Sequence, residues 1–357
     1  MSEQTVSSIA LAPVDALVSV DVVDRTASPD AVGALDQLAS ESQALSMRQR
    51  LPIPEGCVDS HIIWPYLISV VGLHLLMPLM FLPYLFSWTG VASVILGNYL
   101  FCSMGIGAGY HRLLTHRGFQ CSKGFEHFLS LLGVCCLQDS PARWVLIHRL
   151  HHNHSDEQPD PHTPLVNWFW GHVGWLFVEN KQLSTIATYE KYVRDLLEDR
   201  FYLRMERNGM AYWIYLVHAI LFFGLFFLIG WAWAGTLAGG LQYGLSMLFW
   251  GVAMRTIYTW HVTWGINSFS HMWGYRNYET GENSRNNWLF ALATNGEGWH
   301  NNHHADPRSA RHGHRWWELD VTYITLKGLE KLGVVSNVVG PKYSQLNRRI
   351  VVTEKRF

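Results

Sequence analysis

Eight histidines in three short clusters carry the clearest chemical signal in this sequence. They are His111 and His116, then His148, His151 and His152, and finally His300, His303 and His304. Neutral imidazole is the commonest protein ligand for a transition metal. A single metal site takes roughly four to six ligands, so eight closely spaced histidines indicate two metal ions. Imidazole suits iron, zinc, copper and nickel, and the residue types alone leave the choice of metal open.

The spacing within the clusters predicts how the rings are presented. Residues at i, i+3 and i+4 share one face of an α-helix, which fits both His148–His152 and His300–His304. His111 and His116 are five residues apart, a looser spacing, and we expect the apolar helix before them to extend and carry both. Isolated histidines are interpreted as structural residues, and they include His61, His74, His127, His218 and His312.

Acidic residues beside the clusters suggest a second layer of the site. The clusters themselves contain no carboxylate that could bridge two metals as in ferritin-like proteins. Four acids flank the clusters instead, and we expect them to accept hydrogen bonds from the outer imidazole nitrogens: Asp156, Asp160, Glu297 and Asp306. The alternative interpretation is that they are ordinary surface acids.

The elements around the clusters predict an all-α integral membrane protein. Only 15% of the 357 residues are charged and 17 are tryptophan, a composition typical of membrane proteins with aromatic belts. Four apolar stretches approach the roughly 20 residues that span a bilayer, and they cover residues 62–86, 88–107, 211–233 and 237–258. The expected fold is four transmembrane helices with a cytoplasmic helical cap that holds a histidine-rich dimetal site.

The distribution of basic residues predicts the orientation. The connections at residues 86–90 and 233–237 contain no lysine or arginine, whereas basic residues gather at the other ends of the apolar stretches. The positive-inside rule then places both termini and all three clusters in the cytoplasm. Within the cap, we expect residues 125–137 and 165–177 to lie on the membrane surface and residues 181–207 to form a solvated helix.

The ends of the chain and its cysteines suggest no further chemistry. Residues 1–47 contain seven acids and one base without sustained periodicity, which predicts a disordered acidic extension, and residues 341–357 are expected to form a tail. The five cysteines lack Cys-x-x-Cys spacing and are interpreted as reduced, mostly buried thiols. The net charge of −1 provides no basic footprint for nucleic acid.

In this order, the three clusters resemble the histidine boxes of the membrane fatty acid desaturase family. Longer segments resemble the Δ9 acyl desaturase branch of that family, namely Gly107–Arg117, Gly171–Trp175, Asn267–His271, Trp273–Arg276 and Gly296–His304. The resemblance covers residues 55–335 and implies a membrane desaturase domain over residues 48–340.

The resemblance implies a diiron centre of two Fe ions with nine histidine ligands, which are the eight cluster histidines and His271. Asn267 would hold one iron through a water, and one helix face can present Asn267 and His271 because they are four residues apart. Trp264 resembles a wall residue of the substrate tunnel, and the alternative is a plain interfacial tryptophan. The implied reaction uses O2 to remove two hydrogens from a saturated fatty acyl chain, which leaves a cis double bond, expected at Δ9, and water.

Other positions bear on the partners that the resemblance implies. Family members that act on acyl-CoA carry an Arg-Asp pair just before the second box, where this chain has Leu146 and Ile147. Apolar residues there favour an acyl chain on a membrane glycerolipid over acyl-CoA, although Arg143 could meet a phosphate. Electrons would come from a separate ferredoxin or cytochrome b5, since the sequence contains no haem motif or cysteine cluster. Basic residues that could dock an acidic carrier, or meet anionic lipid, are Arg308, Arg311 and Arg315.

Three other functions share parts of this pattern. A membrane hydroxylase or alkane monooxygenase would use the same boxes but insert oxygen, and the Asn267 and His271 motif favours desaturation over it. A histidine-rich metal-binding or transport protein would place ionisable residues inside its spans, where this chain has isolated histidines such as His74 and His218. A bis-histidine haem protein would oppose its ligands across spans and not cluster them.

Overall fold

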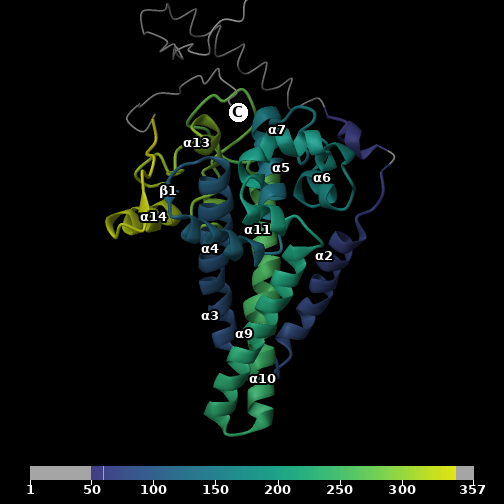
Figure 1. Cartoon of the computed structure of the whole chain (residues 1–357), viewed down its shortest axis with the longest axis vertical. Coiled ribbons are helices and arrows are strands. Elements are labelled where there is room, and N and C mark those ends of the chain that lie inside the picture. The colour runs from purple at the N-terminus through teal and green to yellow at the C-terminus, as the bar shows by residue number, and fades with distance from the viewer. Residues whose placement is uncertain (1–49, 59, 343–357) are drawn as a thin grey trace, which may run out of the picture.

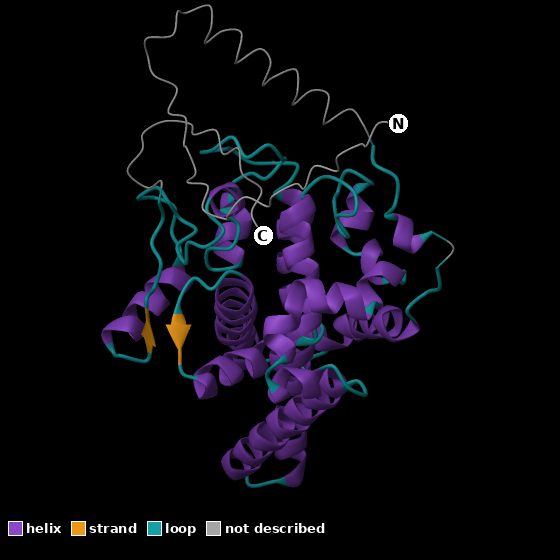
Figure 2. Ribbon diagram, turned by 45° about the horizontal axis from the view of Figure 1, so that its top comes forward, coloured by secondary structure: helices purple, strands orange, loops and turns teal. Residues whose placement is uncertain are grey.

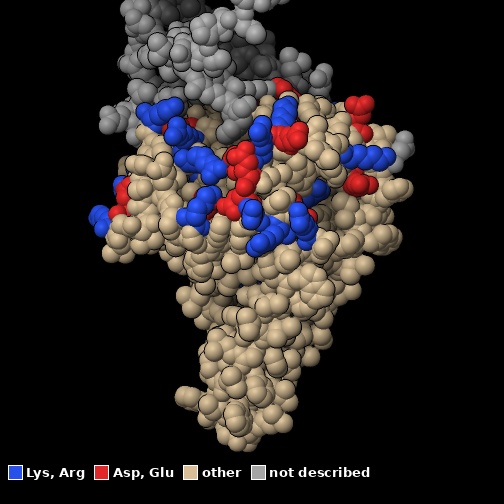
Figure 3. All heavy atoms as spheres, in the orientation of Figure 1, with Lys and Arg blue, Asp and Glu red and all other residues tan. Residues whose placement is uncertain are grey.

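The computed structural model describes residues 50–58 and 60–342, so the predicted acidic extension and residues 343–357 of the predicted tail lie outside the described residues. Long helices run in Figure 1 from a broad cap of short helices to a narrow end, which is the hairpin of α9 (Met210–Ala234) and α10 (Leu237–Met247). Charged side chains gather over the cap in Figure 3, whereas this face of the narrow end is free of them. Polar and apolar surfaces are therefore separated along the long axis.

The first long helix is α2 (Trp64–Leu76), which the 3-10 turn η2 (Met77–Phe81) continues. Pro78 cannot donate a backbone hydrogen bond, and regular α-helical bonding ends just before it. Together, residues Trp64–Phe81 form an 18-residue apolar helix. This helix is shorter than the predicted stretch 62–86, because the chain turns after Phe81.

The second long helix combines α3 (Trp88–Gly97) and η3 (Asn98–Thr115). The Ser87 side chain caps its start by accepting a hydrogen bond from the Gly90 N–H. η3 is a π-helix, in which hydrogen bonds link residues five apart, a winding that is frequent at functional sites. As predicted, the helix extends beyond the apolar stretch 88–107 and reaches the first histidine cluster.

The α9–α10 hairpin leads into the last long helix. α10 continues without a break through the π-helical η6 (Leu248–Met254) into α11 (Arg255–Phe269). Three helices of the described residues are long and apolar enough to cross a membrane: Trp64–Phe81, Trp88–Thr115 and Met210–Ala234. The fourth predicted stretch, 237–258, lies within the α10–α11 helix but is not among these three, since its glycines and Gln242 make it less apolar.

Short helices around η3 form the first part of the cap. They are α4 (Lys123–Val134), α5 (Pro141–His154), α6 (Trp168–His172), α7 (Ile186–Leu197) and α8 (Arg200–Met205), with the 3-10 turns η1 (Glu55–Cys57), η4 (Gly174–Leu176) and η5 (Lys181–Ser184). The helix predicted over residues 125–137 is present as α4, which packs along η3. The single solvated helix predicted over residues 181–207 is wrong. Asp199 caps the separate helix α8, and the side chains of Tyr192 and Tyr202 are buried in the core.

The C-terminal part of the cap closes over η3. It contains α12 (Trp288–Ala293), α13 (His300–Ala305), α14 (Val321–Lys331) and the short strand β2 (Val335–Ser336). β2 pairs antiparallel with β1 (Gln120–Cys121), as Figure 2 shows in orange, and this small ladder is a departure from the predicted all-α fold. The main core lies between η3 and the cap helices, with Leu114, Leu146 and Leu326 fully buried.

Candidate metal centre

The π-helical winding of η3 presents the first pair of histidines. His111 lies on η3 and His116 caps its C-terminal end. In an α-helix, residues five apart would point in different directions, but π-helical hydrogen bonds link such residues from one turn to the next. The two rings are neighbours, with 4.9 Å between their centroids. The π-helical winding of η3 therefore explains why His111 and His116 are neighbours at a spacing of five residues.

Five histidines form a first group, called site A, which comprises His111, His116, His148, His152 and His303. Their candidate ligand nitrogens all lie within 4.8 Å of one another. His303 Nε2 is 3.0 Å from His111 Nε2 and 2.9 Å from His152 Nε2, so one nitrogen of His303 faces two other rings. Nitrogens that converge on one point in this way are arranged as ligands around a single metal ion.

Four histidines form a second group, called site B, which comprises His151, His271, His300 and His304. His271 Nε2 lies 3.0 Å from His300 Nε2. The expectation that one helix face presents Asn267 and His271 is wrong, because α11 ends at Phe269 and a turn delivers His271 to the site. The nine histidines named by the resemblance are the ones that make up sites A and B.

α5 and α13 each supply candidate ligands to both sites. α5 contributes the i, i+4 pair His148 and His152 to site A and His151 to site B, and α13 contributes the pair His300 and His304 to site B and His303 to site A. The prediction that each triplet shares one face is too coarse for this arrangement. Residues at i+3 and i+4 lie on opposite sides of residue i around the helix axis, so a triplet can reach two metals.

Carboxylates hold the outer nitrogens of three of these histidines. The pairs, measured from Nδ1 to a carboxylate oxygen, are His111–Glu297 at 2.5 Å, His151–Asp160 at 3.0 Å and His271–Asp156 at 3.0 Å. Each contact fixes the ring and leaves Nε2 for a metal. The fourth flanking acid differs from the prediction, since Asp306 accepts a hydrogen bond from the backbone N–H of Lys342.

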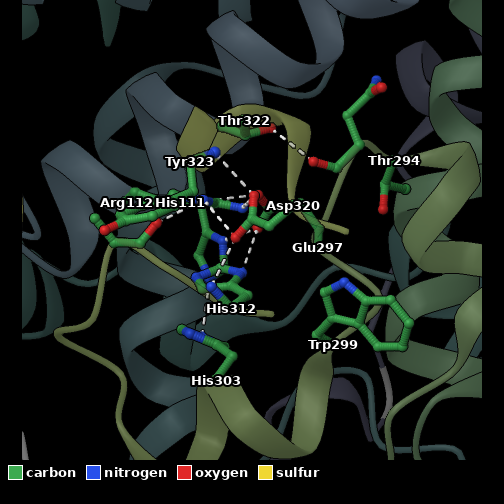
Figure 4. Close-up of polar contacts among 12 residues, drawn as sticks. His111, Arg112, Thr294, Glu297, Trp299, His303, His312, Asp320, Thr322 and Tyr323 are labelled. Atoms are coloured by element: carbon green, nitrogen blue, oxygen red, sulfur yellow. Dashed lines mark hydrogen bonds and ion pairs between the residues drawn. The ribbon is translucent and has the colours of Figure 1, made fainter. Parts of the chain in front are cut away.

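Glu297 also belongs to a buried ion-pair network, shown in Figure 4. Arg112, fully buried on η3, donates from Nε and Nη2 to Glu297 Oε1 over 3.0 and 2.6 Å. Its Nη1 donates to Asp320 Oδ2 over 3.0 Å and to the backbone oxygen of Ala310 over 2.6 Å. Asp320 in turn caps α14 by accepting from the Tyr323 N–H. The network therefore joins the C-terminal segment to η3 directly beside site A.

Burial keeps most of the site histidines neutral. Burial lowers the pKa of His303 well below its ordinary value, and the neighbouring rings lower it further. The same causes lower the pKa of His148, His152, His300 and His304. His271 differs, because the Asp156 carboxylate outweighs burial and raises its pKa to about 9. Binding of a metal at the His271 ring would therefore release a proton.

The donor set fits two transition-metal ions. Among the described residues, His151 Nε2 and His304 Nε2 are buried without a hydrogen-bond partner, although buried polar atoms are normally satisfied. A metal ion at site B would satisfy both nitrogens. Neutral imidazoles with carboxylates behind them are the usual surroundings of protein-bound iron, zinc or copper.

An apolar cavity adjoins both sites. His111, His148 and His300 line it, and so does Asn267 on α11. Trp264 also lines the cavity, where it is 6% exposed and stacks on Trp260 with 5.4 Å between ring centroids. Trp264 is therefore part of the cavity wall and not a plain interfacial residue.

Hydrogen bonds between wall residues constrain the shape of the cavity. Gln138 Nε2 donates to Thr263 Oγ1 over 2.6 Å, which ties the segment before α5 to α11. Trp144 Nε1 donates to Gln138 Oε1 over 3.4 Å, and the Trp144 ring lies 5.0 Å from that of His148. These contacts join the wall of the cavity to the ring of His148 in site A.

Part of the cavity wall is polar. Tyr66 Oη donates to Asp139 Oδ2 over 2.5 Å, and Arg143 Nε donates to the same oxygen over 3.1 Å. Of the two positions that bear on the acyl carrier, Ile147 lines the cavity, whereas Leu146 is buried in the core. The more polar part of a ligand would lie against these polar residues.

Two buried histidines outside the predicted set lie against the sites. His312, interpreted from the sequence as structural, has Nδ1 3.3 Å from Glu297 Oε2 and a ring centroid 4.6 Å from that of His303. The ring centroid of His162 lies 4.5 Å from that of His151. The position of His162 shortly after the second cluster was an available signal, whereas no spacing in the sequence points to His312.

Comparison with known proteins identifies relatives of this chain. A family model described as fatty acid desaturase matches residues 62–329. An sn-1 stearoyl-lipid 9-desaturase of Anabaena variabilis is 38% identical over 275 residues, which are 77% of this chain and 93% of the relative. An sn-2 palmitoyl-lipid 9-desaturase of Nostoc sp. is 37% identical, over 72% of this chain and 84% of the relative. An acyl-CoA C20 Delta5-desaturase of Anemone leveillei is also 37% identical, over 80% of this chain and 83% of the relative.

Proposed function

Because the chain belongs to the fatty acid desaturase family and is a fatty acyl desaturase, we propose that it uses O2 to introduce a cis double bond at the Δ9 position of a saturated acyl chain. The observation that carries this proposal is the location of sites A and B at the wall of one apolar cavity. A metal centre and a long apolar substrate can then meet at one point. The sequence resemblance and the names of the cyanobacterial relatives support the Δ9 position.

We propose that each site holds one iron ion, with the nine histidines as ligands and Asn267 bound to one iron through a water. Two bound irons would supply the O2 activation needed to break unactivated C–H bonds. Glu297, Asp160 and Asp156 hold the Nδ1 atoms of their histidines, so that Nε2 faces the metal. These contacts support metal binding independently of the family resemblance, and the resemblance supports iron as the metal.

Residues of the cavity wall position the substrate. Trp260 and Trp264 provide an apolar surface along α11 and exclude water from the reacting carbons. The Gln138–Thr263 hydrogen bond fixes the shape of the cavity close to His148. A chain held in this shape keeps the same methylene groups beside the two sites, which is the positioning that regioselective chemistry requires.

A membrane glycerolipid is the proposed acyl carrier. Ile147 presents an apolar side chain to the cavity where family members that act on acyl-CoA carry a charged residue. Arg143 is already paired with Asp139 through Nε, and this carboxylate partly offsets the charge that a CoA phosphate would meet. Two of the three relatives described above are named for lipid substrates, and one is named for acyl-CoA.

We further propose four transmembrane helices, with the α10–α11 helix as the fourth, and a cytoplasmic cap with both termini on the same side. Electrons would come from a separate ferredoxin or cytochrome b5. Arg308, Arg311 and Arg315 lie in the C-terminal part of the cap and would attract an acidic carrier.

Product analysis tests the proposed reaction. The chain is expressed in a host with suitable electron carriers and supplied with a deuterated saturated fatty acid. We expect gas chromatography–mass spectrometry to reveal a deuterated cis-9 product that appears first in glycerolipids and later in other pools. A hydroxylated product, or no product from iron-loaded protein with a working donor, would contradict the proposal.

Cys102 offers a test of how the acyl chain lies in the cavity. Among the η3 residues that line the cavity, Cys102 is the farthest along the helix from His111. We expect Cys102→Trp to fill this part of the cavity, so that the ratio of 18-carbon to 16-carbon product falls by roughly 10-fold, because one or two methylenes in an apolar pocket carry this much discrimination. The measurement is the ratio of the two products in a mixed feeding. Cys121→Trp on β1, outside the cavity, is the matched control and should leave the ratio unchanged.

A further inference from the structure

Three histidines outside sites A and B form a linear chain of contacts. His74 Nε2 on α2 lies 2.9 Å from His261 Nε2 on α11, and His261 Nδ1 lies 3.0 Å from His172 Nε2 on α6. The chain ends on oxygen at both sides, because His74 Nδ1 is 2.7 Å from the backbone oxygen of Val70 and His172 Nδ1 is 2.9 Å from Ser268 Oγ.

The ring nitrogens that form these contacts distinguish the three histidines from a metal site. In site A, a single nitrogen of His303 faces two other rings, as ligands of one ion must. His261 instead uses opposite nitrogens for its two neighbours, and one metal ion cannot bind both sides of a ring. The three rings are therefore joined by hydrogen bonds and connect α2 through α11 to the cap.

Neutral rings provide one hydrogen fewer than this series of contacts needs. Ser268 also donates to the backbone oxygen of Trp264, so the chain comprises five contacts in all. Three neutral rings and one hydroxyl provide four hydrogens for these five contacts. Burial, and then the His261 ring, lowers the pKa of His172 to about 4, which keeps this ring neutral near pH 7. With all three rings neutral, one of the five contacts lacks a hydrogen, and separating its two members then costs less than breaking a full hydrogen bond.

His74 lies on α2, a helix between the cavity and the outer surface of the protein. α2 lies at the outer edge of the long helices in Figure 1, and it has no buried residue. Its Ser69 and Val70 line the cavity, whereas Ile68 and Leu75 are exposed on the other side. A single helix therefore separates the cavity from the surface that would face the bilayer.

Both ends of α2 are anchored, and its middle is held by side chains. At the first end, the Ile63 N–H donates to the Phe177 oxygen, and residues 62 and 178 form a β-bridge. At the second end, Trp250 Nε1 donates to the oxygen of the buried Met80. Between these anchors, side chains of α2 contact distant described parts of the chain at Tyr66–Asp139, Ser69–Tyr212 and His74–His261.

We propose that α2 is a lateral gate, which opens beside α11 to admit the acyl chain of a membrane glycerolipid sideways from the bilayer, and that the His74–His261 contact holds it closed. The inference rests on the proposed desaturation of glycerolipid chains. Sideways entry would bring one acyl chain into the cavity while the headgroup and the second acyl chain of the lipid stay in the bilayer. Entry from the bilayer also keeps the apolar chain out of water throughout.

Reversible cross-linking tests the gate. In the double variant His74→Cys with His261→Cys, a short bifunctional methanethiosulfonate links the two cysteines, and dithiothreitol releases them. We expect the linked protein to lose at least ~10-fold in desaturation rate in glycerolipid vesicles, to keep its iron content, and to recover its rate on reduction. The control is the double variant Ile62→Cys with Val178→Cys, which links the bridge at the anchored end and should leave the rate unchanged.

The two proposals fail in different ways. If the linked and reduced forms of the His74 and His261 variant desaturate equally fast, the gate is wrong and α2 is a fixed wall. If the reduced form and the parent protein both bind iron but form no double bond with a working electron donor, the proposed function is wrong. Linking that removes activity in the control variant as well would also overturn the gate, since the anchored end should not move.

Discussion

Replacement of His303 by alanine is expected to lower the desaturation rate by more than ~100-fold, since removing even a group behind a metal ligand typically costs 10- to 100-fold. His303 Nε2 faces both His111 and His152, so its loss removes the nitrogen at the centre of site A. Site B keeps all four of its histidines. Iron should therefore fall from two ions toward one per chain, as measured by metal analysis of the purified protein together with product analysis.

A matched control separates loss of a ligand from loss of any cap histidine. His127 on α4 pairs with Asp199 and lies outside both sites, so His127→Ala should retain iron and activity. If His303→Ala kept two irons and the parent rate, site A would not be a metal site. If instead His127→Ala lost iron as completely as His303→Ala, the effect would reflect general instability of the cap.

Replacement of Arg112 by methionine is expected to destabilise the protein by about 3–5 kcal/mol, the usual cost of removing one partner of a buried ion pair. Arg112 is fully buried and bonds both Glu297 and Asp320. Without it, two carboxylates remain in the interior without their cation. Because Glu297 also holds His111, iron should be lost at a lower temperature than in the parent. Thermal unfolding in detergent, followed by intrinsic fluorescence and by iron release, measures both effects.

The surface pair Arg194–Glu198 on α7 provides the comparison for Arg112. Both of its side chains are mostly exposed, at 78% and 68%, and exposed pairs contribute roughly 0–1 kcal/mol. Arg194→Met should therefore leave the unfolding temperature almost unchanged. Equal unfolding temperatures for the two variants would contradict the role given to the buried network around Glu297.

Much of the candidate site could be predicted because metal ligands are local in sequence. The clusters at His148–His152 and His300–His304 place three rings within two helical turns, and the acids Asp160 and Glu297 lie only a few residues away. His271 stands alone after a helix end, so spacing gives no reason to select it. His312 reaches Glu297 through a loop, and a contact of that kind depends on how the C-terminal segment folds back.

The fold was predictable where hydrophobicity alone decides it. α9 is uniformly apolar and matches the expected stretch 211–233 closely. The structure of residues 181–207 is harder to predict. Their charged residues are typical of a solvated helix, whereas their tyrosines and leucines pack into the core. The π-helical winding of η3 was not predictable either, since no residue type in the segment specifies hydrogen bonds between residues five apart.

The way in which α5 and α13 share their histidines has a mechanical consequence. Each of these two helices holds one group of ligands with its i, i+4 pair and reaches across to the other group with the third ring. A shift of either helix would therefore move ligands of both ions together. If sites A and B each hold an ion, the rise of these two short helices would set the distance between the two ions, and a movement of α2 would leave that distance unchanged.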